Sequence, residues 1–278
     1  MERLDIIINK FRKLKQLDKN FCVFGSEMHE YKFNSPLSKS SLQKFEDINN
    51  IKLPNEYTEF LLKIGNGGAG PHCGLEGISI KRYKRFSDKF RFISDFTPLT
   101  YDNCTRIDED SLDCEDCSER FTCVDAYYED DNEYKYDYIS GYLDGTYLIS
   151  NYGCGSDIRI VLNGPETGNI WYNYPEQIFT PLKGINKDRF SFYDWYENWL
   201  DSNLNKFEFV ENAIRRKADY SEFFVSQYHN PYSEILATYM GISLIREGKI
   251  SHWDRKKLHL HELEINLEEE YYKFLKDM

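Results

Sequence analysis

Apolar residues recur at helical spacing in the first quarter of the chain and predict three helices there. One stripe lies within residues 1–17 and another within residues 40–48, where Ser40 and Gln43 have the spacing of a capping box. Pro54 opens the third helix, because proline is tolerated in a first helical turn.

The clearest helix follows Ser191, which is expected to cap it together with Asp194. A broad aromatic stripe then recurs at helical spacing, and such a stripe indicates a buried helix face rather than a cofactor site. Its members are Phe192, Trp195, Tyr196, Trp199 and Leu200. The pattern of residues 205–278 is mostly helical.

The part of the chain between these helices has patterns typical of strands. Residues 147–149, 158–162 and 170–172 are the best candidates, because they are short apolar runs separated by glycine-rich turns. Residues 77–80 and 90–93 are shorter candidates.

Negative charge is concentrated in one segment. Residues 102–133 contain 13 acidic and two basic residues, a net charge of −11, whereas the whole chain of 278 residues carries −12. The remainder is therefore almost balanced. Nucleic acid is not expected as a partner of the whole chain, because phosphate binding needs a basic face.

Positive charge gathers just before that segment. Six basic residues alternate with Tyr83, Phe86 and Phe90. They are Lys81, Arg82, Lys84, Arg85, Lys89 and Arg91. The pattern permits a nucleic-acid patch, but we favour a solvated strand and loop that faces the acidic segment of the same chain.

Composition places the chain among globular proteins. Aromatic residues make up 16% of it, which is far more than a disordered acidic chain would carry. No apolar run approaches the roughly 18 residues of a membrane span, and the first 17 residues lack a secretory apolar core. We therefore expect a cytoplasmic protein without a membrane association. Seven cysteines, an odd number, argue against a disulfide framework.

Four of these cysteines form the sharpest chemical constellation. Cys114 and Cys117 have the C-x-x-C spacing that can place two thiolates on one metal ion. Cys104 and Cys123 lie within ten residues on either side and would complete a four-thiolate zinc site. The alternative is an ordinary acidic insertion with free thiols, because 13 carboxylates in the same segment add like charge.

Other motifs do not support an enzyme. Residues 65–70 fit G-x-G-x-x-G, but the motif follows a predicted helix, whereas a dinucleotide loop must follow a strand and open a helix. We expect Gly65 to cap that helix in a left-handed conformation. His72 and Cys73 are adjacent, and adjacent side chains rarely face each other as a base and a nucleophile must.

Several of these segments resemble the SUKH superfamily. Leu53-Pro54 with Tyr57 and Phe60, followed by the glycine loop at 66–71, is similar to the family's N-terminal signature. Further matches are Gly74-Leu75, Gly153-Cys154-Gly155, Gly164, Gly168, Trp171, Ser191-Phe192 and Trp199-Leu200. The resemblance extends over roughly residues 37–204 and is interrupted by the acidic insertion.

The resemblance implies an α+β fold, with a twisted, mainly antiparallel sheet packed against helices. We expect a SUKH-like domain at 1–204 with an insertion at about 101–137, and a helical C-terminal extension at 205–278. Bacterial members of the superfamily act as immunity proteins that bind and neutralise toxins, and no catalytic residues accompany the family. The rival interpretation is a regulatory or scaffolding module with a non-toxin partner. A toxin gene directly upstream would favour immunity.

The acidic insertion is the candidate contact with such a toxin. A nuclease must present a basic surface to its substrate, so an acidic inhibitor could mimic phosphates and steer the encounter. The alternative is that the charge only keeps a long insertion solvated. The candidate residues are Asp108, Glu109, Asp110, Asp113, Glu115 and Asp116, with Tyr127 and Tyr128 as aromatic anchors.

Overall fold

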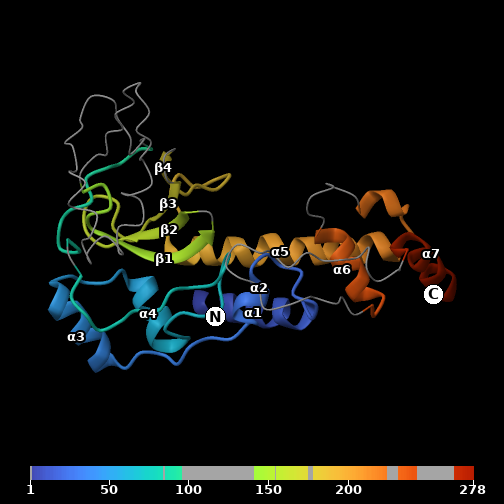
Figure 1. Cartoon of the computed structure of the whole chain (residues 1–278), viewed down its shortest axis with the longest axis horizontal. Coiled ribbons are helices and arrows are strands. Elements are labelled where there is room, and N and C mark those ends of the chain that lie inside the picture. The colour runs from blue at the N-terminus through green and yellow to red at the C-terminus, as the bar shows by residue number, and fades with distance from the viewer. Residues whose placement is uncertain are drawn as a thin grey trace, which may run out of the picture. The chain divides into compact units, whose positions relative to one another are not determined.

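The computed structural model describes residues 2–83, 85–95, 141–153, 155–174, 178–223, 231–242 and 266–278. These residues form seven α-helices, one 3-10 helix and a four-stranded antiparallel sheet (Figure 1). The predicted α+β class is confirmed.

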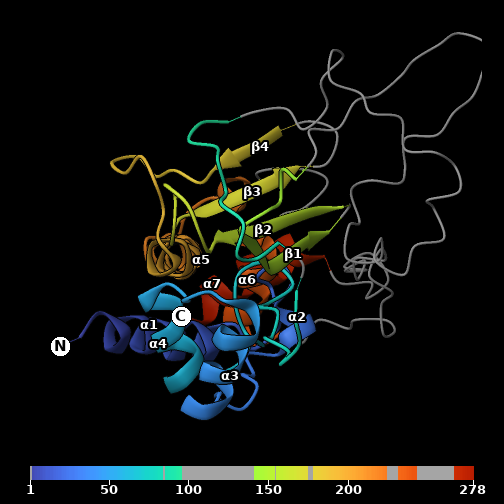
Figure 2. The same cartoon turned by 90° about the vertical axis from the view of Figure 1, so that its left-hand side faces the viewer.

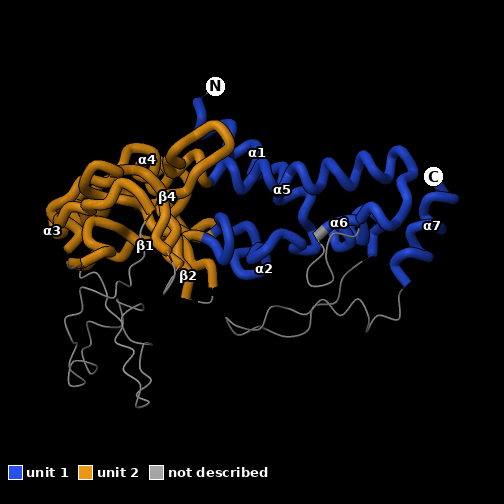
Figure 3. Tube along the Cα trace, turned by 90° about the horizontal axis from the view of Figure 1, so that it is seen from above, with its two compact units in different colours: residues 1–32, 69–74, 196–278 blue, residues 33–68, 75–195 orange. Residues whose placement is uncertain are grey.

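Contacts between Cα atoms group the chain into two compact units (Figure 3). Unit 1 comprises residues 1–32, 69–74 and 196–278, and unit 2 comprises residues 33–68 and 75–195. The predicted domains at 1–204 and 205–278 are continuous segments of sequence, and that division remains a prediction.

The sheet of unit 2 follows the chain in simple order, with each strand antiparallel to the next (Figure 2). Its strands are β1 Thr146–Gly153, β2 Ser156–Val161, β3 Ile170–Tyr174 and β4 Ile178–Pro181. The first three confirm the predicted strands. β4 was not predicted, because it has only four residues and ends in proline, which a sheet accepts at an edge strand.

An aromatic cluster forms the core beside this sheet. The Trp171 ring meets Phe90 and Phe179 edge-on, with ring centroids 4.8 and 5.2 Å apart. Val161 and Tyr142 complete the buried cluster. Trp171 and Phe179 lie on the neighbouring strands β3 and β4, so the cluster joins these two strands to the segment that contains Phe90.

The two short candidate strands at 77–80 and 90–93 are wrong, because neither segment forms a strand. The Ile78 amide donates to the side chain of Asn66, and the Phe90 amide donates to the carbonyl of Asn163. These bonds take the place of a strand ladder, and Ile78 and Phe90 are buried by loop packing instead.

Two helices of unit 2, α3 Lys39–Asn49 and α4 Asn55–Lys63, correct two sequence predictions. Ser38, rather than Ser40, is the N-cap of α3, because its hydroxyl accepts from the Ser41 amide. Gly65 does not have the expected left-handed conformation. A side chain at that position would meet the Asn34 carbonyl at 2.7 Å, so close backbone approach explains the glycine.

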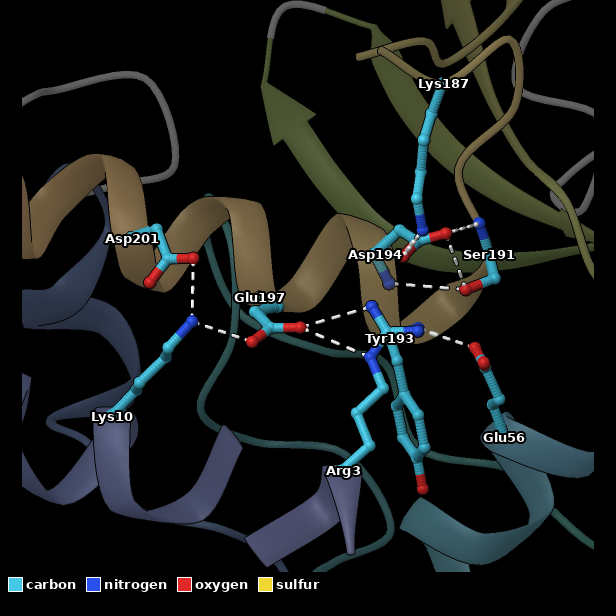
Figure 4. A network of polar contacts seen from close by, with 9 residues as sticks. All are labelled: Arg3, Lys10, Glu56, Lys187, Ser191, Tyr193, Asp194, Glu197 and Asp201. Carbon is cyan, nitrogen blue, oxygen red and sulfur yellow. Dashed lines mark hydrogen bonds and ion pairs between the residues drawn. The ribbon is translucent and has the colours of Figure 1, made fainter. Parts of the chain in front are cut away.

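Helix α5, Phe192–Arg215, begins as predicted (Figure 4). Asp194 accepts from the Ser191 amide and hydroxyl at 3.1 and 3.0 Å, while the Asp194 amide donates to Ser191 Oγ. The predicted aromatic stripe is buried throughout. Within unit 2, Phe192 packs its ring against Tyr57 and Phe60 of α4.

In unit 1, ion pairs join helix α1, Arg3–Leu17, to α5 (Figure 4). Lys10 Nζ lies 2.7 Å from a Glu197 oxygen and 2.8 Å from an Asp201 oxygen, and Arg3 contacts the other Glu197 oxygen. The nearby carboxylates raise the pKa of Lys10 against the effect of desolvation, which lowers it. The groups remain partly exposed, so these pairs specify the contact more than they stabilise it.

A buried carboxylate organises the segment that follows α1 and includes the short helix α2, Ser26–His29. Asp18 is only 1% exposed. It accepts from the amides of Cys22 and Val23 and from the hydroxyls of Ser26 and Tyr31, at 2.6, 3.1, 3.1 and 2.6 Å. This single side chain therefore holds together four points of the segment that ends at Tyr31.

The C-terminal part of unit 1 is helical, as predicted, in its described residues. It contains the 3-10 helix Tyr220–Phe223, α6 Pro231–Tyr239 and α7 Leu267–Asp277. Tyr271 of α7 is buried, contacts the Phe223 ring and donates to the Ala218 carbonyl at 2.9 Å.

Two histidines of unit 1 predict acid sensitivity. Burial lowers the pKa of His29 to about 4 from 6.5, partly opposed by the Gly70 backbone, and burial also lowers the pKa of His72 to about 4. Between pH 4 and pH 6.5, these histidines bind protons in the unfolded chain but not in the folded chain. Stability should therefore fall as pH decreases from 6.5 to 4, by up to about 3 kcal/mol for His29.

The urea midpoint at pH 7 and pH 4.5 measures this loss. The His29→Asn variant keeps an acceptor for the Tyr31 amide, which donates to His29 Nδ1 in the wild type. It should lose less stability on acidification than the wild type. An equal loss would mean that His29 is not the source of the acid sensitivity.

Candidate partner-binding surface

The residues that sequence reasoning selected for partner and metal binding lie outside the described residues. They all fall between residues 96 and 140, and they comprise the eight contact candidates and the four candidate zinc ligands. Their roles remain predictions. The described part of the chain presents a different surface next to them in sequence.

This surface is the basic loop, defined here as residues 80–83 and 85–93. All five of its described cationic residues are exposed, and they are Lys81, Arg82, Arg85, Lys89 and Arg91. Isoleucines lie at its two ends, with Ile80 37% and Ile93 62% exposed. The loop therefore combines exposed positive charge with exposed apolar ends.

The loop belongs to unit 2, where hydrogen bonds from two asparagines hold its backbone. At its start, the Asn49 side chain donates to the Lys81 carbonyl at 3.0 Å and accepts from the Tyr83 amide at 2.7 Å. Further along, the Asn163 side chain donates to the Ser87 carbonyl, and the Asn163 carbonyl accepts from the Phe90 amide. Two asparagines thus fix both halves of the loop.

Glycines let the loop approach its neighbours closely. A side chain at Gly145 would meet the Asp88 carbonyl at 2.5 Å, and one at Gly164 would meet the Phe90 carbonyl at 2.2 Å. Both glycines also have a positive φ. Larger residues at either position would displace the loop backbone.

The aromatic side chains of the loop point inwards. Phe86 and Phe90 are buried, and the Tyr83 ring stacks on Phe86 with centroids 4.5 Å apart and planes 9° apart. Phe86 in turn meets the Tyr147 ring of β1 at 5.6 Å. The alternation of basic and aromatic residues in the sequence therefore separates an exposed charged side from a buried aromatic side.

A cavity of about 580 Å³ lies close to this loop within unit 2. It is lined by Glu46, Asp47, Asn50, Ile51, Lys52, Leu162, Asn163 and Thr167. Glu46 is buried, accepts from the Leu53 amide at 2.9 Å and pairs with Lys52 at 2.6 Å. Asn163 lines the cavity and also anchors the loop. Within the lining, Glu46 and Lys52 form an ion pair with each other.

No catalytic or metal constellation appears in the described ranges. Within them, no group of three or more histidine, cysteine or acidic side chains could hold a metal ion. His72 is half-buried with a positive φ of 57°, and its ring contacts Phe24. Cys22 is buried, with its sulfur 3.6 Å from Thr238 Oγ1, and Cys73 is partly exposed.

The zinc prediction is tested by metal analysis. Protein purified without chelators should contain about one zinc ion per chain, bound through the sulfurs of Cys104, Cys114, Cys117 and Cys123. Cys114→Ser should abolish the metal, whereas Cys73→Ser should leave it unchanged. Zinc-free wild-type protein would favour the alternative of free thiols in an acidic insertion.

Comparison with models of known protein families identifies the family of the chain. The model of the SMI1/KNR4 family (SUKH-1) matches residues 36–202, which is more than half of the chain. The chain belongs to the SMI1/KNR4 family (SUKH-1). The predicted SUKH resemblance is thereby confirmed. The SUKH match includes α3, α4, the sheet, the basic loop and the first half of α5.

The SUKH family is generally associated with toxin immunity, and its domains are generally non-catalytic immunity or regulatory proteins. No curated protein and no solved structure matches the chain significantly. Among the described residues, no helix has the length and apolar character needed to cross a membrane.

Proposed function

We propose that this SUKH chain is an immunity protein that binds a cognate bacterial toxin stoichiometrically and blocks its action. The observation that carries this proposal is the family match over residues 36–202. An inhibitor of this kind needs a stable surface rather than an acid, base or nucleophile set. Unit 2, with the rings of Phe90 and Phe179 packed against Trp171 and against each other, supplies such a scaffold.

The rival proposal is a regulatory or scaffolding module with a non-toxin partner. The identity of the neighbouring gene distinguishes the two, since immunity genes must accompany their toxins. A growth assay then tests the proposal directly. Expression of the neighbouring toxin alone should arrest growth, and co-expression of this chain should restore it. A non-cognate SUKH protein serves as control. Continued arrest with a folded, well-expressed chain would contradict the immunity proposal.

The acidic segment is our proposed contact with the toxin. Its −11 charge in 32 residues would attract the basic surface of a nuclease and orient the encounter. The proposed contacts are Asp108, Glu109, Asp110, Asp113, Glu115 and Asp116, with Tyr127 and Tyr128 as anchors. A cytoplasmic location would follow from this role, because the toxin must be met inside the cell that it would kill.

A further inference from the structure

We infer that the basic loop is a second docking surface, which binds an acidic patch on a protein partner. The inference rests on the proposed function, because it takes the cognate toxin to be that partner. The toxin would then meet the acidic segment with a basic region and the basic loop with an acidic region. Two contacts of opposite sign would fix the orientation of the complex and exclude partners with other charge patterns.

The first argument is that two cations of the loop are exposed and have no neutralising partner among the residues that the structure describes. Arg85 pairs with Asp144 at 3.2 Å. Arg82 and Lys89 are exposed and have no ion-pair partner in the described part of the chain. Lys81 and Arg91 lie over the rings of Tyr83 and Phe92, at 4.8 and 5.3 Å from the ring centroids. The described residues of the loop include five cations and one acid, Asp88, in a chain whose acidic residues outnumber its basic ones by twelve.

The second argument is that the loop is held in place before any partner arrives. Its backbone is bonded to Asn49 and Asn163 and packs against Gly145 and Gly164. At its end, Arg189 donates to the Ile93 carbonyl at 2.5 Å. A surface that is already ordered loses little conformational entropy on binding, which favours affinity.

The third argument concerns the two apolar ends. Ile80 and Ile93 are both exposed large hydrophobic residues, and they flank the cationic residues in the sequence. Protein interfaces combine apolar with polar contacts, so the two isoleucines add apolar area that a protein partner would cover.

The same geometry disfavours nucleic acid as the occupant. Single-stranded nucleic acid binds by stacking its bases on exposed aromatic rings. Phe86 and Phe90 are buried, and the Tyr83 ring already stacks on Phe86.

The test compares charge reversal at the loop with matched reversal elsewhere. The loop variant is Arg82→Glu with Lys89→Glu, and the control is Lys13→Glu with Lys19→Glu, at exposed residues of unit 1. Binding to the neighbouring-gene toxin is measured by surface plasmon resonance at low and high salt, after melting curves show that both variants fold. The loop variant should bind at least 10-fold more weakly at low salt, and the control should bind like the wild type. Equal affinities, or tighter binding by the loop variant, would overturn the inference.

Two further probes separate this inference from the proposed function. If wild-type protein does not bind the toxin, the proposed function fails. Binding of a fluorescein-labelled octaglutamate peptide then tests, without the toxin, whether the basic loop binds acidic side chains. Anisotropy at low salt should show binding to the wild type and the control but not to the loop variant. Equal peptide binding by all three would overturn the inference. Loop-dependent binding of a 20-nucleotide RNA that is tighter than peptide binding would also overturn it, in favour of nucleic acid.

Discussion

Replacement of Asp18 by alanine should lower the free energy of unfolding by at least about 3 kcal/mol. Hydrogen bonds to a charged group are worth roughly 1.5–3 kcal/mol each, and four bonds of one network are lost together, so their contributions do not simply add. The Asp18 carboxylate accepts from two backbone amides and two hydroxyls and is almost inaccessible to water. Alanine would leave these donors buried without an acceptor. The segment they hold also contains left-handed residues, including Phe21, Gly25 and Tyr31.

Urea denaturation measures this effect, and two variants bracket it. Tyr31→Phe removes one of the four donors and should cost about 1.5–3 kcal/mol, less than the loss of all four bonds. Asp188→Ala removes an exposed carboxylate and should change stability by less than about 0.5 kcal/mol. If Asp18→Ala were as stable as Asp188→Ala, the carboxylate would not organise this part of unit 1.

Neutralisation of six acids in the acidic segment should slow association with the cognate toxin about tenfold or more at low salt. The changes are Asp108→Asn, Glu109→Gln, Asp110→Asn, Asp113→Asn, Glu115→Gln and Asp116→Asn. Steering acts through long-range attraction, which salt screens over about 10 Å at 0.1 M. The variant should therefore also show a flatter dependence of association rate on ionic strength, with an unchanged melting temperature.

A control with the same change in net charge separates local steering from overall charge. Its six exposed acids lie in described regions, and they are Asp188, Glu208, Glu211, Glu268, Glu269 and Asp277. Their neutralisation should affect the rate much less. If the two variants gave coincident curves of rate against ionic strength, the acidic segment would not be the steering surface.

Periodicity predicted the helices best, because amphipathic stripes depend on local sequence. The stripe from Phe192 to Leu200 is buried as expected, and the Ser191–Asp194 cap forms as expected. The start of α3 was misplaced by two residues because Ser38, Ser40 and Ser41 are all capable caps. Only the geometry shows that Ser38 Oγ receives the Ser41 amide.

Long-range contacts explain most of what the sequence could not reveal. Asp18 follows a helix and resembles a surface residue until Tyr31 folds back to donate to it. Residues 77–80 and 90–93 resemble strands, but Asn66 and Asn163 satisfy the amides of Ile78 and Phe90. A single sequence gives no signal for such side-chain and loop pairings.

The basic loop was visible in the sequence as a charged stretch, whereas its partner chemistry depends on structure. The sequence alone left open a nucleic-acid patch, because basic and aromatic residues alternate there. Burial of Phe86 and Phe90 removes the stacking rings that such a patch would need. Anchoring by Gly145 and Gly164, more than 50 residues away in the sequence, could not be predicted from local pattern.

The central claim is stoichiometric neutralisation of a toxin, and titration of toxin activity tests it most directly. Purified toxin from the neighbouring gene is held at a fixed concentration well above the dissociation constant, and this protein is added in steps. The account predicts a linear loss of activity that reaches zero at one equivalent, with a one-to-one complex recovered by size-exclusion chromatography. Complete inactivation by a small fraction of an equivalent would indicate catalysis, and full activity at several equivalents would exclude neutralisation; either result would contradict the account.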